Sequence, residues 1–281
     1  MNLTVVAREL PDALVSHLTD LVGRAPSLRE QDRARWAHAP DGPPMREAVA
    51  QACAANASDF AYLPADMRLE SFALLAMDMD STLISIECID EVADFAGRKA
   101  EVSAITEAAM RGEITDYKES LRRRVALLEG LPQEALARVL EERLRLNPGA
   151  ERLVSTARAA GLRTLLVSGG FTFFTDSMRE RLSLDEVRSN ELEIRGGKLT
   201  GALLGDIVDA QVKAQTLAAS CERLGVPPSR AIAMGDGAND LAMMRLAGLS
   251  VAYHAKPVVR SQTTASIDVG GLDVLLRWLA P

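Results

Sequence analysis

Short continuous apolar runs, each followed at once by a polar cluster, constrain the fold of this chain more than any other feature. Three runs occupy residues 72–77 (FALLAM), 164–167 (TLLV) and 231–234 (AIAM), and residues 251–253 form a shorter fourth candidate. Runs of this length without alternation are typical of strands that are buried on both faces of a parallel sheet. Helical patterns lie between them at residues 151–160, 211–224 and 240–247. The alternation predicts an α/β fold built on a doubly wound parallel sheet.

The interval between the first two runs does not fit simple alternation. Residues 83–163 are mostly helical in pattern, with candidates at 86–96, 101–110, 116–128 and 132–144. We therefore expect a helical cap inserted into the sheet domain at about residues 84–150. Farther along, residues 190–201 (NELEIRGGKLTG) place a Gly-Gly turn between two strand-like arms, which predicts a β-hairpin.

The first 70 residues carry no chemical signature. Strand candidates at 3–6 and 31–37 alternate with helical patterns at 14–22 and 45–54, and residues 38–44 (HAPDGPP) indicate a loop. We expect a small α/β module at residues 1–70 and a catalytic domain at residues 71–281. A regulatory role for the module and a homodimer formed through it stay open.

Composition excludes several classes of protein. The chain has 281 residues, of which 48% are hydrophobic and 25% charged, so it has enough apolar surface to fold. No run approaches 18 apolar residues, and the start of the chain lacks the pattern of a secretory signal, so we expect no membrane span and no export. The net charge of −7 argues against a nucleic-acid partner. Cys53, Cys88 and Cys221 are widely separated, which predicts buried thiols and a reducing cytoplasm.

The polar clusters after the runs contain the candidate metal ligands. Because parallel strands end at the same edge of a sheet, we expect four carboxylates to converge there: Asp78, Asp80, Asp236 and Asp240. Carboxylates packed together repel one another unless a cation lies among them. A hard cation with oxygen ligands fits this group, and Mg²⁺ suits a site that also receives a substrate phosphate.

A second set of residues predicts a phosphate site at the same edge. Ser168 and the backbone around Gly169 follow the second run, and glycine lets a phosphate approach the N–H groups closely. Lys213 would supply positive charge. Each motif alone has an ordinary alternative: turn carboxylates, a simple turn, a helix cap at Asp240, a solvated lysine. Their joint occurrence, each after an apolar run, favours the functional interpretation.

Four segments in this order, DMDST, VSGGF, DAQVKA and GDGANDLAMM, resemble the signature motifs of the haloacid-dehalogenase-like (HAD) phosphohydrolases. The resemblance covers the chain from about residue 72 to its end. Two longer segments, DSTLISIECIDEVADFAG and ESLRRRVALLEGLP, are similar to the phosphoserine phosphatases within that superfamily. The resemblance implies Mg²⁺-dependent hydrolysis of O-phospho-L-serine to L-serine and phosphate through an aspartyl-phosphate, the last step of serine biosynthesis.

The same resemblance implies roles for the catalytic residues. Asp78 would be the nucleophile, and Asp80 would act first as general acid and then as general base. Asp78, the backbone carbonyl of Asp80 and Asp236 would hold Mg²⁺, with Asp240 orienting these ligands and Lys213.

Substrate-binding roles follow from the resemblance in the same way. Ser168, Gly169 and Lys213 would bind the phosphoryl oxygens, and Asn239 would help to position the substrate. In the cap, Glu87 would meet the ammonium group and Arg124 the carboxylate of phosphoserine. The adjacent Arg122 and Arg123 leave the register open, and a solvated basic helix face is the alternative for all three. A phosphatase or phosphotransferase with another small phosphate ester, or a non-catalytic sensor module, remains as an alternative function.

Overall fold

The computed structural model describes residues 1–110 and 113–280, and in this part of the chain one mixed sheet of eleven strands organises the molecule. The strands follow the order β2-β3-β1-β4-β11-β10-β9-β5-β6-β7-β8. Their bounds are β1 Asn2–Val6, β2 Leu28–Arg29, β3 Arg33–Trp36, β4 Asp59–Leu63, β5 Leu74–Met77, β6 Arg163–Phe171, β7 Glu186–Arg195, β8 Lys198–Leu204, β9 Ala231–Gly235, β10 Leu249–Tyr253 and β11 Ala265–Ile267.

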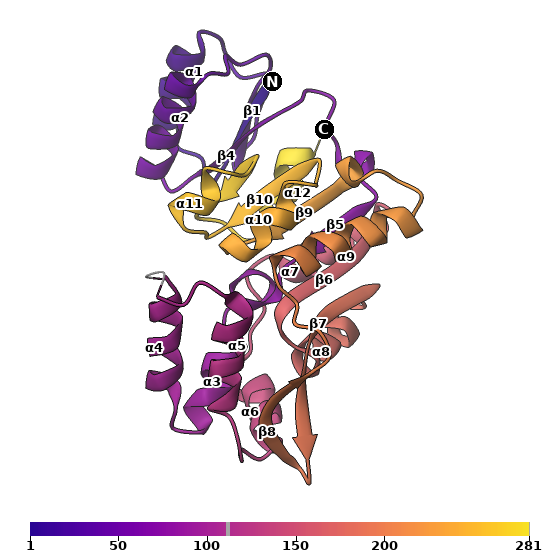
Figure 1. Cartoon of the computed structure of the whole chain (residues 1–281). Helices are drawn as coiled ribbons and strands as arrows, with labels where there is room; N and C mark the ends of the chain where they lie inside the picture. Colours follow the sequence, from indigo (N-terminus) through magenta and orange to yellow (C-terminus); the bar gives the residue numbers. More distant parts are fainter. Residues whose placement is uncertain (111–112, 281) are drawn as a thin grey trace.

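The helices cover both faces of the sheet or form the cap (Figure 1). Their bounds are α1 Asp12–Val22, α2 Pro43–Ala55, α3 Cys88–Phe95, α4 Lys99–Met110, α5 Tyr117–Ala126, α6 Glu134–Arg138, α7 Ala150–Ala159, α8 Thr172–Leu182, α9 Ala210–Arg223, α10 Leu241–Met244, α11 Pro257–Arg260 and α12 Val274–Leu279. No described helix combines the length and the apolar composition needed to cross a membrane.

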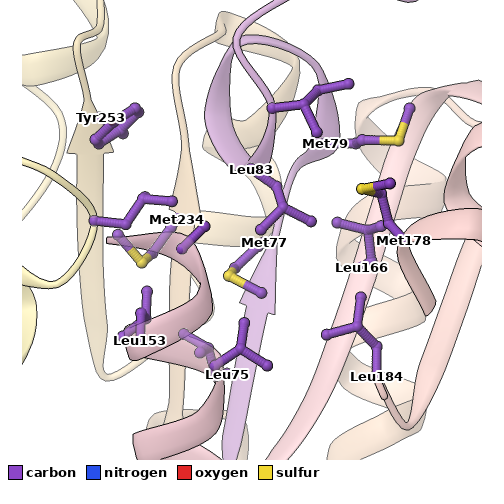
Figure 2. Packing of buried hydrophobic residues seen from close by; sticks show 14 of the residues in the cluster. Leu75, Met77, Met79, Leu83, Leu153, Leu166, Met178, Leu184, Met234 and Tyr253 are labelled. Atoms are coloured by element: carbon purple, nitrogen blue, oxygen red, sulfur yellow. The ribbon is translucent and has the colours of Figure 1, made fainter. Parts of the chain in front are cut away.

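The centre of the sheet is parallel and deeply buried. β5 pairs in parallel with β9 on one side and with β6 on the other, and every residue of β5, β9 and β10 is buried. Side chains alternate between two apolar layers: Leu75 and Met77 point into the layer drawn in Figure 2, and Leu74 and Ala76 into the opposite layer. Burial on both faces explains why these strands are continuous apolar runs. The predicted doubly wound α/β fold is confirmed.

One strand is longer than the sequence suggested. The run at 164–167 continues through the Ser-Gly-Gly segment to Phe171 as β6, with a shift of register against β7 after Val167. The apolar run therefore marked only the first part of this strand, and the simple turn that was the alternative for the Ser-Gly-Gly segment is not formed. The polar backbone of the predicted phosphate site belongs to the irregular end of a strand.

The residues between β5 and α7 form the expected helical insertion, with α3, α4, α5 and α6 packed beside one edge of the sheet (Figure 1). Its two connections meet at a neck, where Ile84 and Leu146 form an antiparallel bridge and the Asn147 amide donates to the carbonyl of Thr82 at 2.8 Å. On its far side the insertion pairs with the hairpin β7–β8, through backbone bonds of 2.9 Å that join Gly130 and Leu131 to Leu199. The hairpin at 190–201 is confirmed, with its turn at Gly196-Gly197.

The first 63 residues form a four-stranded antiparallel part of the sheet with α1 and α2 packed against it (Figure 1). The predicted strands at 3–6 and 31–37 and both helices are confirmed, whereas β2 and β4 were not predicted. β4 also pairs with β11 through Phe60 and Ser266, so the sheet continues into the part of the chain that follows. Cys53, Cys88 and Cys221 are free and buried, as expected.

Candidate active site

Asp78 lies at the end of the central strand. Its backbone N–H continues the ladder by donating to the carbonyl of Met234 at 3.0 Å, and the chain then turns away from the sheet. The side chain is only 5% exposed, and its Oδ1 accepts the N–H of Met79 at 2.7 Å. A carboxylate that is fixed in this way at the carboxyl end of a parallel strand stands where ligands bind in open α/β sheets.

A buried lysine neutralises part of this charge. Lys213 lies in the first turn of α9, and the side chain of Asp209 caps that helix by accepting the N–H of Val212 at 2.9 Å. The Lys213 ammonium is fully buried, and its Nζ lies 2.7 Å from Oδ2 of Asp78 and 2.7 Å from Oδ1 of Asp240. Burial lowers the pKa of Lys213, but Asp240 and Asp78 raise it more, so the pKa lies above its ordinary value and the side chain stays charged.

Two further carboxylates follow β9. Asp236 accepts the Thr82 hydroxyl at 2.9 Å, and Asp240 accepts the N–H of Gly237 at 3.1 Å with its second oxygen. Ligand atoms of Asp78, Asp236 and Asp240 lie within 4.8 Å of one another. Burial and the charge of Asp78 raise the pKa of both Asp236 and Asp240 to about 7.

This group of carboxylates fits a divalent cation. The described cluster holds three acidic side chains and one buried ammonium group, that of Lys213. The ammonium forms ion pairs with Asp78 and Asp240, which leaves the charge of Asp236 to be balanced by another cation. The raised pKa values show the cost of so much negative charge out of water. Hard oxygen ligands of this kind suit Mg²⁺. Asp236 is the side chain best placed to hold it. Lys213 contacts one oxygen of Asp78 and one of Asp240, whereas the Thr82 hydroxyl engages a single oxygen of Asp236.

Asp80 stands apart from this group, so the expectation that four carboxylates converge is correct for three. Its side chain turns toward the backbone N–H of Cys88, at 3.4 Å. Burial, with Glu87 and Asp78 adding to it, raises the pKa of Asp80 well above its ordinary value. The chain reaches this position through a tight turn at residues Met79–Leu83, in which Ser81 takes a positive φ of 56°. A raised pKa favours the protonated form of this carboxyl group, and in that form it can donate a proton.

The predicted phosphate segment lies opposite, at the end of β6. Ser168 is buried, and its Oγ accepts the N–H of Gly170 at 2.9 Å, so this N–H is not turned outward as we expected. A Cβ on Gly170 would lie 3.0 Å from Oδ2 of Asp80, so only glycine fits without a shift. The buried Asn190 amide donates to the Gly169 carbonyl at 2.7 Å and accepts the N–H of Val208 at 2.8 Å. Asn190 therefore ties this segment to the chain that leads into α9.

The cap contributes the predicted recognition residues. Glu87 precedes α3 and accepts the Ser81 hydroxyl at 2.7 Å. Burial raises the pKa of Asp90 and of Glu87, and the positive charge of Arg124, which is partly buried on α5, opposes part of this rise. Arg122 and Arg123 are exposed, and Arg123 pairs with Glu119 at 2.8 Å. The structure thus separates Arg124 from its two neighbours.

Asn239 and two unpredicted residues complete the surroundings. Asn239 is partly buried in the short 3₁₀ turn Ala238–Asp240. Thr82, which orients Asp236, and Asn190, which holds Gly169, were not among the predicted residues. Thr82 lies inside the DMDST segment and could have been found there. Asn190 has no local signal, because its partners are backbone groups of two distant segments.

Comparison with known proteins identifies the family to which the chain belongs. A family model described as haloacid dehalogenase-like hydrolase matches residues 75–245. A phosphoserine phosphatase of Polaromonas sp. is 62% identical over 216 residues, which cover 75% of this chain and 92% of that protein. The crystal structure of a probable phosphoserine phosphatase from Vibrio cholerae, unliganded, matches with a TM-score of 0.85 and 38% identity over 99% of this chain and 86% of that chain. A substrate-bound phosphoserine phosphatase complex matches with a TM-score of 0.69 and 35% identity, over 74% of this chain and 98% of that chain.

Proposed function

The chain belongs to the haloacid dehalogenase-like hydrolase family and is a phosphatase, and from this premise we propose that it hydrolyses O-phospho-L-serine to L-serine and phosphate. The observation that carries the proposal is the buried Asp78 carboxylate at the end of β5, held by Lys213 beside Asp236 and Asp240. A nucleophile, a fixed cation and a divalent-metal site are thereby present within one cluster. These are the parts that phosphoryl transfer requires.

In the first step Asp78 attacks the phosphorus. A bond forms between a carboxylate oxygen of Asp78 and phosphorus, and the bond from phosphorus to the serine oxygen breaks in line with it. Asp80 gives its proton to the departing serine oxygen. The raised pKa of Asp80, caused mainly by burial, supports this role because it favours the protonated form of the carboxyl group.

In the second step a water hydrolyses the aspartyl-phosphate. Asp80, now a carboxylate, takes a proton from the water as the water oxygen bonds to phosphorus and the bond to Asp78 breaks. Lys213 stays charged throughout and, with Ser168 and Gly169, binds the phosphoryl oxygens. Mg²⁺, held by Asp78, the backbone carbonyl of Asp80 and Asp236, would neutralise negative charge on the phosphoryl group when bound. Asp240 orients Lys213, and Asn239 positions the substrate.

Specificity for phosphoserine rests on the cap. Glu87 would receive the substrate ammonium, and Arg124 would bind the carboxylate with a two-pronged contact. The inward position of Arg124, in contrast to Arg122 and Arg123, supports this assignment. We propose that residues of about 84–150 act as a lid that excludes water before the intermediate forms.

The central experiment measures phosphate release from L-phosphoserine, D-phosphoserine, phosphothreonine and p-nitrophenyl phosphate, with Mg²⁺ and with EDTA. We expect strong, metal-dependent preference for L-phosphoserine and no release by the Asp78→Asn variant. Activity on other esters with phosphoserine poor would overturn the substrate. Release to an added alcohol acceptor instead of water would indicate a phosphotransferase, and inactivity on every substrate would favour a sensor module.

Arginine variants test the recognition residue. Arg124→Gln should lower kcat/KM for phosphoserine by about 100-fold, since a charge-assisted contact is lost at a partly buried site, and it should leave p-nitrophenyl phosphate nearly unaffected. Arg123→Gln is the matched control, because its exposed pair with Glu119 contributes little. Equal effects of the two variants would contradict the assignment.

The remaining proposals concern the context of the enzyme. The free buried thiols suit a reducing compartment, so we infer that the enzyme works in the cytoplasm on a small-molecule substrate, as the last step of serine biosynthesis. Residues 1–70 are proposed as a module distinct from the catalytic domain at 71–281. Size-exclusion chromatography with light scattering tests the homodimer for which this module offers a surface.

A further inference from the structure

The side chain of Tyr117 connects the cap to the phosphate segment. Tyr117 is the first residue of α5 and packs against the large apolar cluster to which both the cap and the sheet contribute. A Cβ built on Gly169 would overlap the Tyr117 hydroxyl oxygen, and the ring carbon Cζ would be the next nearest atom at 3.5 Å. The phenol group of a cap residue therefore lies directly against Gly169, between Ser168 and Gly170.

Charged groups of the site surround this hydroxyl. Burial raises the pKa of Tyr117, so the phenol keeps its proton at any ordinary pH. The charges of Lys213 and Arg124 oppose this rise, and those of Asp78 and Asp80 add to it. The hydroxyl therefore lies within the electrostatic field of the groups proposed to bind the substrate.

Lys118, the next residue along α5, links the cap to the start of α9. Lys118 forms an ion pair with Asp209, with 3.0 Å between Nζ and Oδ2, and Asp209 is the residue that caps α9. α9 carries Lys213 in its first turn. Two consecutive cap residues therefore contact the two segments, β6 and α9, that supply the predicted phosphate ligands.

We propose that the Tyr117 hydroxyl donates a hydrogen bond to the phosphoryl group of the substrate, so that the cap contributes directly to phosphate binding. This hydroxyl lies directly beside Gly169 in the Ser168-Gly169-Gly170 segment. A protonated phenol is a donor and a phosphoryl oxygen is a strong acceptor. The inference rests on the proposed function for the identity of the substrate, but it needs only that the site binds phosphate.

The test compares Tyr117→Phe with Lys118→Met, in the full chain with Mg²⁺. Titration calorimetry measures the binding of inorganic phosphate, and kinetics measure kcat/KM for phosphoserine and p-nitrophenyl phosphate. We expect Tyr117→Phe to weaken phosphate binding by about 10- to 100-fold, the range for one hydrogen bond to a charged acceptor, and to lower kcat/KM similarly for both esters. Lys118→Met, which leaves the hydroxyl in place, should change phosphate binding less than about twofold.

Two results would overturn the inference. Phosphate binding by Tyr117→Phe that equals the wild type would show that the hydroxyl makes no contact with the phosphoryl group. A loss confined to phosphoserine, with p-nitrophenyl phosphate unaffected, would place the contact on the amino-acid part of the substrate. Failure of the wild type to turn over phosphoserine would refute the proposed function, but the phosphate titration would still decide the role of Tyr117. Equal melting temperatures of the variants would exclude misfolding as the cause.

Discussion

Replacement of Lys213 by methionine tests how the charge in the site is balanced. The Lys213 ammonium is fully buried and lies 2.7 Å from both Asp78 and Asp240. Methionine is apolar and of similar length, so Lys213→Met fills most of the space but leaves two buried carboxylates without this cation. Removing one member of a buried ion pair costs about 3–5 kcal/mol, because the remaining charge is neither solvated nor paired.

The expected effect is large enough for calorimetry. For a chain of this size about 1 kcal/mol corresponds to roughly 2 °C in Tm, so Lys213→Met in EDTA at pH 8 should melt about 6–10 °C below the wild type. Lys118→Met is the matched control, since it also removes a lysine from an ion pair. The side chains of that pair are 40% and 21% exposed, and such pairs contribute at most about 1 kcal/mol.

The loss of Tm in Lys213→Met should also depend on pH and on Mg²⁺. The loss should shrink at pH 5, where protonation removes charge from the unpaired carboxylates, and it should shrink with saturating Mg²⁺, which supplies positive charge. A Lys213→Met protein that melts within about 2 °C of the wild type in EDTA at pH 8 would refute the reasoning. It would mean that the metal-free site does not hold two ionised carboxylates against the ammonium.

Three more predictions follow from named contacts. Burial raises the pKa of Asp236 to about 7, whereas its pKa in the unfolded chain is about 4. The folded state therefore binds the proton of Asp236 more tightly, so this group stabilises the fold fully below about pH 4, and the stabilisation is lost as the pH rises toward 7. The Tm in EDTA should therefore fall between pH 5 and pH 8, and a flat profile would count against this. Gly169→Ala should lower the free energy of unfolding by about 1–3 kcal/mol by its clash with the Tyr117 hydroxyl, and adding Tyr117→Phe should recover much of that stability; a double variant no more stable than Gly169→Ala would disprove the contact. Asp59→Asn should lower stability by about 2–3 kcal/mol in urea unfolding, because Asp59 accepts N–H groups of Asp268, Val269 and Gly270 at 2.7–3.0 Å and an amide can accept only part of them; unchanged stability would contradict this.

The sheet centre could be predicted from sequence because its strands are buried on both faces. Such strands must be apolar at every position, so residues 74–77 and 231–235 stand out without any knowledge of their partners. The short β2 and β11 have no such signature, since a strand of two or three residues is too short to show a period. Helix α8, with the sequence TFFTDSMRERL, was also not predicted.

The candidate site was partly predictable for a related reason. Topology alone carries Asp78 and Asp236 to one edge, since each directly follows a parallel strand. The orientation of Asp80 toward Cys88 depends on the turn at residues 79–83, which no strand pattern encodes. Tyr117 is a single aromatic residue at a helix start, and its role depends on where the cap packs. Contacts of this kind join segments about fifty residues apart and leave no local trace.

The contacts between the first 63 residues and the rest of the chain also could not be predicted from the sequence. β3 contributes Arg35, a buried guanidinium that donates to the carbonyls of Trp278 and Ala280 at 3.2 and 2.6 Å. These carbonyls lie at the end of α12, where a helix has no backbone partners of its own. β4 meanwhile covers β11, the outermost parallel strand, which would otherwise present an open edge. We infer that this segment stabilises the catalytic part by satisfying a helix end and a sheet edge, a role that requires no ligand and that a sequence cannot reveal when partners are 243 positions apart.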